Sequence, residues 1–121
     1  MRILISKDPR YPIDNKKVRS KIRKILTRNK IGDDYELSVA FVGKRKAKQY
    51  NEDYRKMDYI PEVLSFSQKG EKAGDKKLIG DLLICLPQAR ERAIEENRMV
   101  DEVLDELYEH GIKNLVNDLP E

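Results

Sequence analysis

The sequence is poor in the side chains that most often carry catalytic and metal chemistry. Its 121 residues include one cysteine, one histidine and no tryptophan. The lone Cys85 excludes an internal disulfide and every Cys-x-x-Cys motif, which fits a reducing compartment, and its apolar neighbours predict a small buried side chain. No Gly-rich phosphate loop or Ser-His-Asp set can be assembled either. We therefore expect no small-molecule cofactor.

Long hydrophobic runs are also missing. No apolar run approaches the roughly 20 residues that a membrane-spanning helix needs. The first six residues are a short apolar run followed at once by charge, without the hydrophobic region and small-residue cleavage site of a signal peptide. These absences predict a cytoplasmic protein with no membrane partner.

Charge is abundant and unevenly distributed. Apolar and charged residues each make up 39% of the chain. Its length predicts one compact domain over residues 1–121. Residues 1–60 hold 17 Lys and Arg against 8 Asp and Glu, whereas residues 61–121 hold 8 against 14, for a total net charge of +3. The basic half could bind a polyanion such as RNA, or the opposite charges of the two halves could form ion pairs on the surface.

The periodicity of the apolar residues predicts an α+β fold. Between about residues 15 and 29 they recur at i, i+4, i+7 and i+8, typical of an amphipathic helix, and over 35–42 they alternate as in a strand. Together they give a small sheet covered by helices. The expected elements are strand 2–6, helix 15–29, strand 35–42, helix 44–54, strand 63–66, an exposed loop 67–77, strand 78–86, and helices 88–97 and 101 onward.

The last helix carries the only histidine. His110 and Asn114 are four residues apart and so project from one helix face, the spacing at which two histidines would clamp a metal. Taken alone, a single histidine on such a helix is more often a packed core residue than a ligand. Asp118, four residues further on, is a weak substitute donor that would face His110 only if the helix continued past Asn117. A turn is expected there.

Five short motifs stand in order along nearly the whole chain. They are Leu37-Ser38-Val39-Ala40-Phe41-Val42, Asn51-Glu52-Asp53-Tyr54-Arg55-Lys56-Met57-Asp58, Glu62-Val63-Leu64-Ser65-Phe66, Gly80-Asp81-Leu82-Leu83-Ile84, and His110-Gly111 followed by Asn114-Leu115. In this order and spacing they resemble the motifs of the YbeY family, bacterial metal-dependent endoribonucleases linked to ribosomal RNA maturation. The last motif resembles the family's His-Gly-x-x-His-Leu.

The resemblance implies a mixed, mostly parallel four-stranded sheet flanked by helices. It also implies a zinc ion held by three histidines, of which His110 is one, and an arginine in the cleft that falls on Arg55. Metal-assisted hydrolysis of RNA would follow, with Arg55 and His110 as catalytic residues and ribosomal RNA or the ribosome as partner. The alternative for Arg55 is a surface salt bridge with Asp53 or Asp58.

The departures from the family pattern lie near the implied metal site. The positions of the second and third histidines hold Asn114 and Pro120, the glycine after His-Leu is Asn117, and the usual Thr-Asp reads Pro61-Glu62. Asparagine is a poor zinc ligand and proline offers no side-chain ligand. We therefore expect zinc binding to be weak or absent and cleavage to be impaired.

Two other functions remain open. The chain could be a non-catalytic module that binds RNA or the ribosome, or a redesigned inactive scaffold on the YbeY fold. In the binding module, the RNA would contact two basic clusters, one on the first helix and one at the start of the second, formed by Lys16, Lys17, Lys21, Lys24, Lys44, Arg45 and Lys46.

Overall fold

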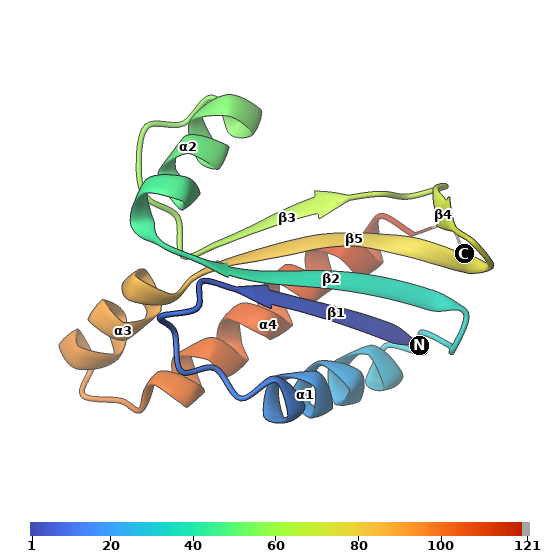
Figure 1. Cartoon of the computed structure of the whole chain (residues 1–121), viewed down its shortest axis with the longest axis horizontal. Helices are drawn as coiled ribbons and strands as arrows, with labels where there is room; N and C mark the ends of the chain where they lie inside the picture. Colours follow the sequence, from blue (N-terminus) through green and yellow to red (C-terminus); the bar gives the residue numbers. More distant parts are fainter. Residues whose placement is uncertain (120–121) are drawn as a thin grey trace.

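The protein is a mixed β-sheet with three helices on one face and one helix on the other (Figure 1), seen here in a computed structural model that describes residues 1–119. The α+β prediction is confirmed. The elements of this range are β1 (Arg2–Lys7), α1 (Asn15–Arg28), β2 (Tyr35–Val42), α2 (Lys44–Arg55), β3 (Val63–Ser67), β4 (Lys72–Ala73), β5 (Lys76–Cys85), α3 (Leu86–Glu95) and α4 (Val100–Asn117).

The four longer strands lie in the order β1-β2-β5-β3 and form the small mixed sheet that was expected. β1 and β5 each pair with β2 in parallel, whereas β3 runs antiparallel to β5 and forms an edge of the sheet. The two-residue β4 was expected to be loop. It pairs with the start of β5 through a tight turn in which Gly74 has φ +64°.

The core lies between the sheet and α1, α3 and α4. Alternate residues of the strands face these helices and join the apolar stripes of α1 and α4 in one buried cluster. Within it, the rings of Phe41 and Tyr108 meet edge to face at 6.4 Å, and burial raises the pKa of the Tyr108 hydroxyl. No helix among residues 1–119 is long and apolar enough to cross a membrane.

The opposite face of the sheet is covered only at one end, by α2 (Figure 1). Here a smaller cluster, which includes Ala47, Leu64 and Cys85, packs α2 on the sheet. Cys85 is 1% exposed, as its apolar neighbours predicted, and burial raises the pKa of its thiol. The helix therefore shields one end of this face and leaves the strands beyond it open.

A local irregularity in β5 depends on Gly80. The pairing of β2 with β5 shifts register between Glu36 and Leu37, because Ile79 is passed over on β5. Gly80 follows with φ +153°, and an added Cβ would lie 2.2 Å from the backbone oxygen of Phe66 on β3. Only glycine allows β3 to approach this closely.

Candidate functional site

A cleft lies along the edge strand β3, between α4 and the last residue of α2. Two adjoining hollows of about 270 Å³ and 720 Å³ form it, and they share Arg55, Val63 and His110. The smaller hollow is also lined by Ser65, Ser67, Asn114 and Asp118, and the larger by Tyr59, Glu62, Gln88, Arg92 and Glu106. The structure thus brings Arg55 and His110 to one solvent-open site from helices far apart in the sequence.

Helix α4 presents three of the predicted site residues on one face. His110, Asn114 and Asp118 are spaced by four residues and line the same hollow. The helix ends at Asn117, near the expected turn, but Asp118 keeps a nearly helical backbone (φ −84°, ψ −10°), which holds its side chain on this face. His110 is exposed, so the interpretation as a packed core residue is wrong.

Gly111 determines how closely α4 approaches the sheet. A Cβ on Gly111 would lie 2.1 Å from Leu82 Cδ1 of the core. The Ser65 hydroxyl on β3 donates a hydrogen bond to the Gly111 carbonyl at 3.1 Å. Gly111 therefore packs against the sheet, and this contact holds the adjacent His110 at the edge of β3.

Arg55 ends α2, and the chain turns sharply after it. Lys56 adopts the left-handed conformation (φ 57°), and the fully buried Asn51 donates from Nδ2 to the carbonyl of Tyr59 at 3.1 Å. Asn51 thereby ties the loop after α2 back to the helix. Asp58 pairs instead with Lys48 at 3.5 Å, and among residues 1–119 Arg55 forms no ion pair with Asp53 or Asp58.

The donors at the cleft do not fit a three-histidine metal site. Across residues 1–119, no three or more His, Cys, Asp or Glu side chains lie together as a metal would require. His110 and Asp118 are the only such donors lining the smaller hollow within that range, and the Asn114 amide between them is a poor ligand. Pro120, at the third ligand position, lies outside the described residues.

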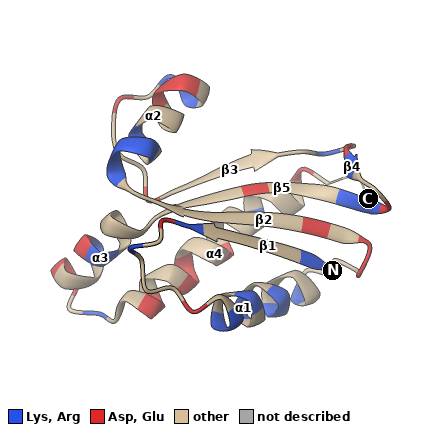
Figure 2. Ribbon diagram, in the orientation of Figure 1, with Lys and Arg blue, Asp and Glu red and all other residues tan. Residues whose placement is uncertain are grey.

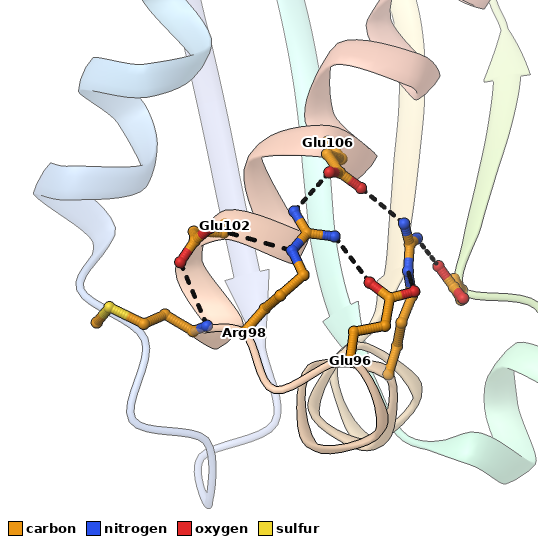
Figure 3. Close-up of polar contacts among 7 residues, drawn as sticks. Glu96, Arg98, Glu102 and Glu106 are labelled. Atoms are coloured by element: carbon orange, nitrogen blue, oxygen red, sulfur yellow. Dashed lines mark hydrogen bonds and ion pairs between the residues drawn. The ribbon is translucent and has the colours of Figure 1, made fainter.

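Along the larger hollow, arginines and glutamates form a connected network of ion pairs. Arg92 of α3 contacts Glu62 at 2.8 Å, Glu96 at 3.2 Å and Glu106 of α4 at 2.6 Å. Arg98 bridges Glu96 at 2.8 Å and Glu106 at 2.5 Å (Figure 3). The network links the residue before β3 to the helix that carries His110, one turn beyond Glu106.

Glu106→Gln should destabilise the protein at neutral pH and have no effect at strongly acidic pH. Hydrogen bonding to Arg98 lowers the pKa of Glu106, so its contribution to stability is present above its unfolded pKa and is lost as the pH falls through the lower folded pKa. Thermal unfolding followed by circular dichroism from pH 7 to pH 2 checks this. Glu95→Gln, an exposed α3 residue with no ion pair among residues 1–119, is the control. Equal loss at both ends of the pH range would contradict the prediction.

The predicted RNA-contacting lysines lie away from the cleft. On α1, Lys17 pairs with Asp101 at 2.5 Å and Lys21 with Asp105 at 2.7 Å, so both bind α4. Figure 2 shows the blue segments of α1 and the red segments of α4. Lys16 and Lys24 are exposed and have no ion pair among the described residues. Lys44 of α2 pairs with Glu91, whereas Arg45 and Lys46 are exposed. The two halves of the chain therefore pair in part, as their opposite charges allowed.

Sequence reasoning overlooked the polar residues that support the cleft. Ser65 and Ser67 lie on the same side of β3 as Val63, so strand alternation could have placed them there. Arg92 and Glu106 gave no such signal, because their pairing depends on how α3 packs against α4.

The fold and cleft define an α+β protein with an arginine–histidine site at a sheet edge. A model of the family described as Endoribonuclease YbeY matches residues 4–116. The chain belongs to this family. Among its relatives are the Endoribonuclease YbeY proteins of Finegoldia magna (32% identity, covering 82% of this chain and 65% of the relative), Staphylococcus carnosus (35%, 72% and 60%) and Bacillus thuringiensis (33%, 82% and 69%).

The fold is also similar to a solved structure. A solution structure of a protein from Thermotoga maritima matches with a TM-score of 0.66 and 25% identity, and the match covers 94% of this chain and 71% of that one. This chain spans less than two thirds of the length of the F. magna and S. carnosus relatives.

Proposed function

We propose that this chain binds RNA at the cleft and acts on ribosomal RNA, in the cytoplasm, as a metal-poor and impaired YbeY-type endoribonuclease. The observation that carries the proposal is the meeting of Arg55 and His110 at one open cleft. Family membership supports RNA as the substrate class.

The cleft residues have complementary roles toward a phosphodiester. Arg55 can form paired hydrogen bonds to phosphate oxygens, which position the backbone and oppose charge that develops on it. His110 is exposed at the opposite wall and can accept or donate a proton at its ring nitrogens. The Asn114 amide can donate a hydrogen bond to the same oxygens. These contacts bind and orient RNA without requiring a metal.

The proposed impairment follows from the chemistry of the ligand positions. A zinc ion in this family type would polarise the phosphate and activate water. Asn114 and Pro120 replace two of its three histidines, and His110 with Asp118 provides too few donors for tight binding. Cleavage should therefore be slow, while binding through Arg55 persists.

Arg55→Ala should weaken binding of a single-stranded ribosomal RNA fragment about tenfold, as expected for a charge-assisted hydrogen bond. His110→Ala should leave affinity nearly unchanged and abolish the residual cleavage. Fluorescence anisotropy and gel analysis of the same end-labelled RNA measure both. Arg23→Ala on α1 removes the same charge away from the cleft and serves as control. Equal weakening by Arg55→Ala and Arg23→Ala would contradict a specific cleft contact.

The alternative is a non-catalytic module that binds RNA or the ribosome through two basic clusters, one at the start of α2 (Lys44, Arg45 and Lys46) and one on α1. On α1, Lys16 and Lys24 have no ion pair among residues 1–119, whereas Lys17 and Lys21 pair with α4. This alternative predicts salt-sensitive binding to structured ribosomal RNA that weakens when the four lysines of α1 are replaced.

A further inference from the structure

The open face of the sheet carries a second pair of hollows that shares no residue with the cleft. A hollow of about 350 Å³ lies over the middle of β2 and β5, and a groove of about 800 Å³ continues from it toward the start of α2. The two share Ser6, Ala40, Tyr50 and Leu83. They therefore form one continuous depression on the face opposite α1 and α4.

One end of this depression is strongly basic. Its lining includes a single acid, Asp8, and five basic residues: Lys7, Arg10, Lys44, Arg45 and Lys46. Asp8 forms an ion pair with Arg10 at 2.7 Å, and hydrogen bonds from Arg10 lower the pKa of Asp8 to about 2. Lys44 pairs with Glu91. Arg45 and Lys46 are exposed and have no ion pair among residues 1–119. This end favours a ligand with several negative charges.

Helix α2 reinforces that preference. It begins at this end with three cations in its first turn (Figure 2), and its N-cap Gly43 provides no side-chain hydrogen bond. Cations at a helix N-terminus are opposed by the helix dipole. A bound phosphate would offset that repulsion and accept from the uncapped backbone N–H groups.

The other end carries one carboxylate without a partner. Asp81 lies beside Ser38 on β2 and Phe66 on β3, and lines the smaller hollow. Burial raises its pKa, and no neighbour among residues 1–119 offers it a hydrogen bond. An ionised carboxylate only accepts hydrogen bonds. A ligand that reaches this end must therefore donate to it.

Beside Asp81 the depression is lined by aromatic rings and small side chains. The walls include Tyr50 and Phe66, and both rings contact the exposed Tyr54, at 5.7 Å and 5.3 Å between centroids. Ser38 and Ala40 form part of the floor, and their small side chains leave room for a flat ring. The strand rise places Asp81 about 13 Å from the end of β5. There Cys85 pairs with Val42, which lies just before the cations at the start of α2. Phosphates at one end and a base at the other can span this length.

We propose that this face binds single-stranded RNA, with phosphates in the basic groove and a guanine base at Asp81. Guanine presents two adjacent N–H donors on one edge, so a carboxylate can accept from both at once. The other bases present one. A basic peptide would satisfy Asp81, but the cations of the groove would repel it. The inference shares with the proposed function only the assumption that RNA is the ligand, since it uses none of the cleft residues.

Two heptamer RNAs test the proposal, one all-uridine and one with a single central guanosine. We expect the wild-type chain to bind the guanosine heptamer about tenfold more tightly by fluorescence anisotropy, in line with bidentate base contacts. Asp81→Asn should remove this preference and leave the affinity for all-uridine RNA unchanged. The double change Arg45→Glu and Lys46→Glu should weaken both RNAs equally and reduce the salt dependence of binding.

The controls separate this site from the cleft. Arg23→Glu on α1 should change nothing, and Arg55→Ala should preserve the guanosine preference. Equal affinity of the wild-type chain for both RNAs, or a preference that survives Asp81→Asn, would overturn the proposal. So would saturable binding of free GTP without binding of either RNA, which would identify a mononucleotide site. If Arg55→Ala alone weakens RNA binding, the cleft proposal stands and this one fails. If only Asp81→Asn and the double change at Arg45 and Lys46 weaken RNA binding, this proposal stands and the cleft proposal fails.

Discussion

Asn114→His is expected to strengthen metal binding at the smaller hollow of the cleft. The new histidine would lie one turn from His110 and line the same hollow as Asp118, which supplies three donors on one helix face. By apportioning the free energy of structural zinc sites among their ligands, we expect one added donor to strengthen zinc binding roughly 100-fold. Competition of the purified protein against a chromogenic chelator measures the affinity, and elemental analysis gives the stoichiometry.

Two further variants show whether the gain comes from the geometry of α4. Thr27→His adds a histidine on the exposed surface of α1 and should bind no more zinc than the parent chain. Combining Asn114→His with Asp118→Asn should lose most of the gain, because it removes the third donor. A gain that Thr27→His reproduces would mean that zinc binds any surface histidine, and it would contradict the assignment of the cleft.

Restoring both missing histidines extends the same experiment to activity. The combination of Asn114→His and Pro120→His should hold one zinc per chain and cleave single-stranded RNA faster than the parent chain. If this double variant gains neither metal nor cleavage, the positions aligned here with the family's ligands are not its ligand positions. One zinc per chain in the unmodified protein would overturn the proposed impairment.

Gly80→Ala is expected to cause the largest loss of stability of any single methyl addition in the sheet. The new Cβ would lie 2.2 Å from the Phe66 carbonyl, and alanine disfavours φ +153°. Strain and overpacking together should cost about 3 kcal/mol or more. For a chain of this length, that lowers the thermal midpoint by roughly 10 °C.

Gly74→Ala is the matched control for this prediction. Gly74 also has a positive φ (+64°), but nothing lies within 4 Å of an added Cβ. It should therefore show only the conformational cost, about 1 kcal/mol. Thermal and urea unfolding of the two variants separate backbone strain from the steric clash. Equal losses would show that β3 can move away from β5 at this point.

The local patterns in the sequence were enough to predict most of the helices and strands. The helix 15–29 and the strand 35–42 follow from apolar periodicity, which the solvent imposes on any element with one buried face. The start of α3 was less well placed. The helix was expected over residues 88–97, but it runs from Leu86 to Glu95. β4 was not predicted, because two residues are too few to show the alternation of a strand. They form a strand only by pairing with β5.

The candidate site was predictable only in part. The motif around Arg55 and the His110-Gly111 pair identified two side chains of the cleft. The exposure of His110 was not predictable from its own helix, since it depends on β3 ending the sheet beside α4. Likewise, the assignment of α1 lysines to RNA could not foresee that Lys17 and Lys21 would face the acids of α4.

The sequence by itself determined the periodicity of the elements, the family resemblance and the chemistry available at the ligand positions, because these depend on residue identity and spacing along one chain. Tertiary structure alone decided which charges are paired, that Arg55 and His110 share a cleft, and that Asp81 shares the opposite face with the basic groove. The residues involved lie far apart in the sequence: 55 positions separate Arg55 from His110, and 35 separate Asp81 from Lys46. Their relative positions are set by how the helices pack on the sheet, where a single glycine such as Gly80 or Gly111 fixes the distance of approach.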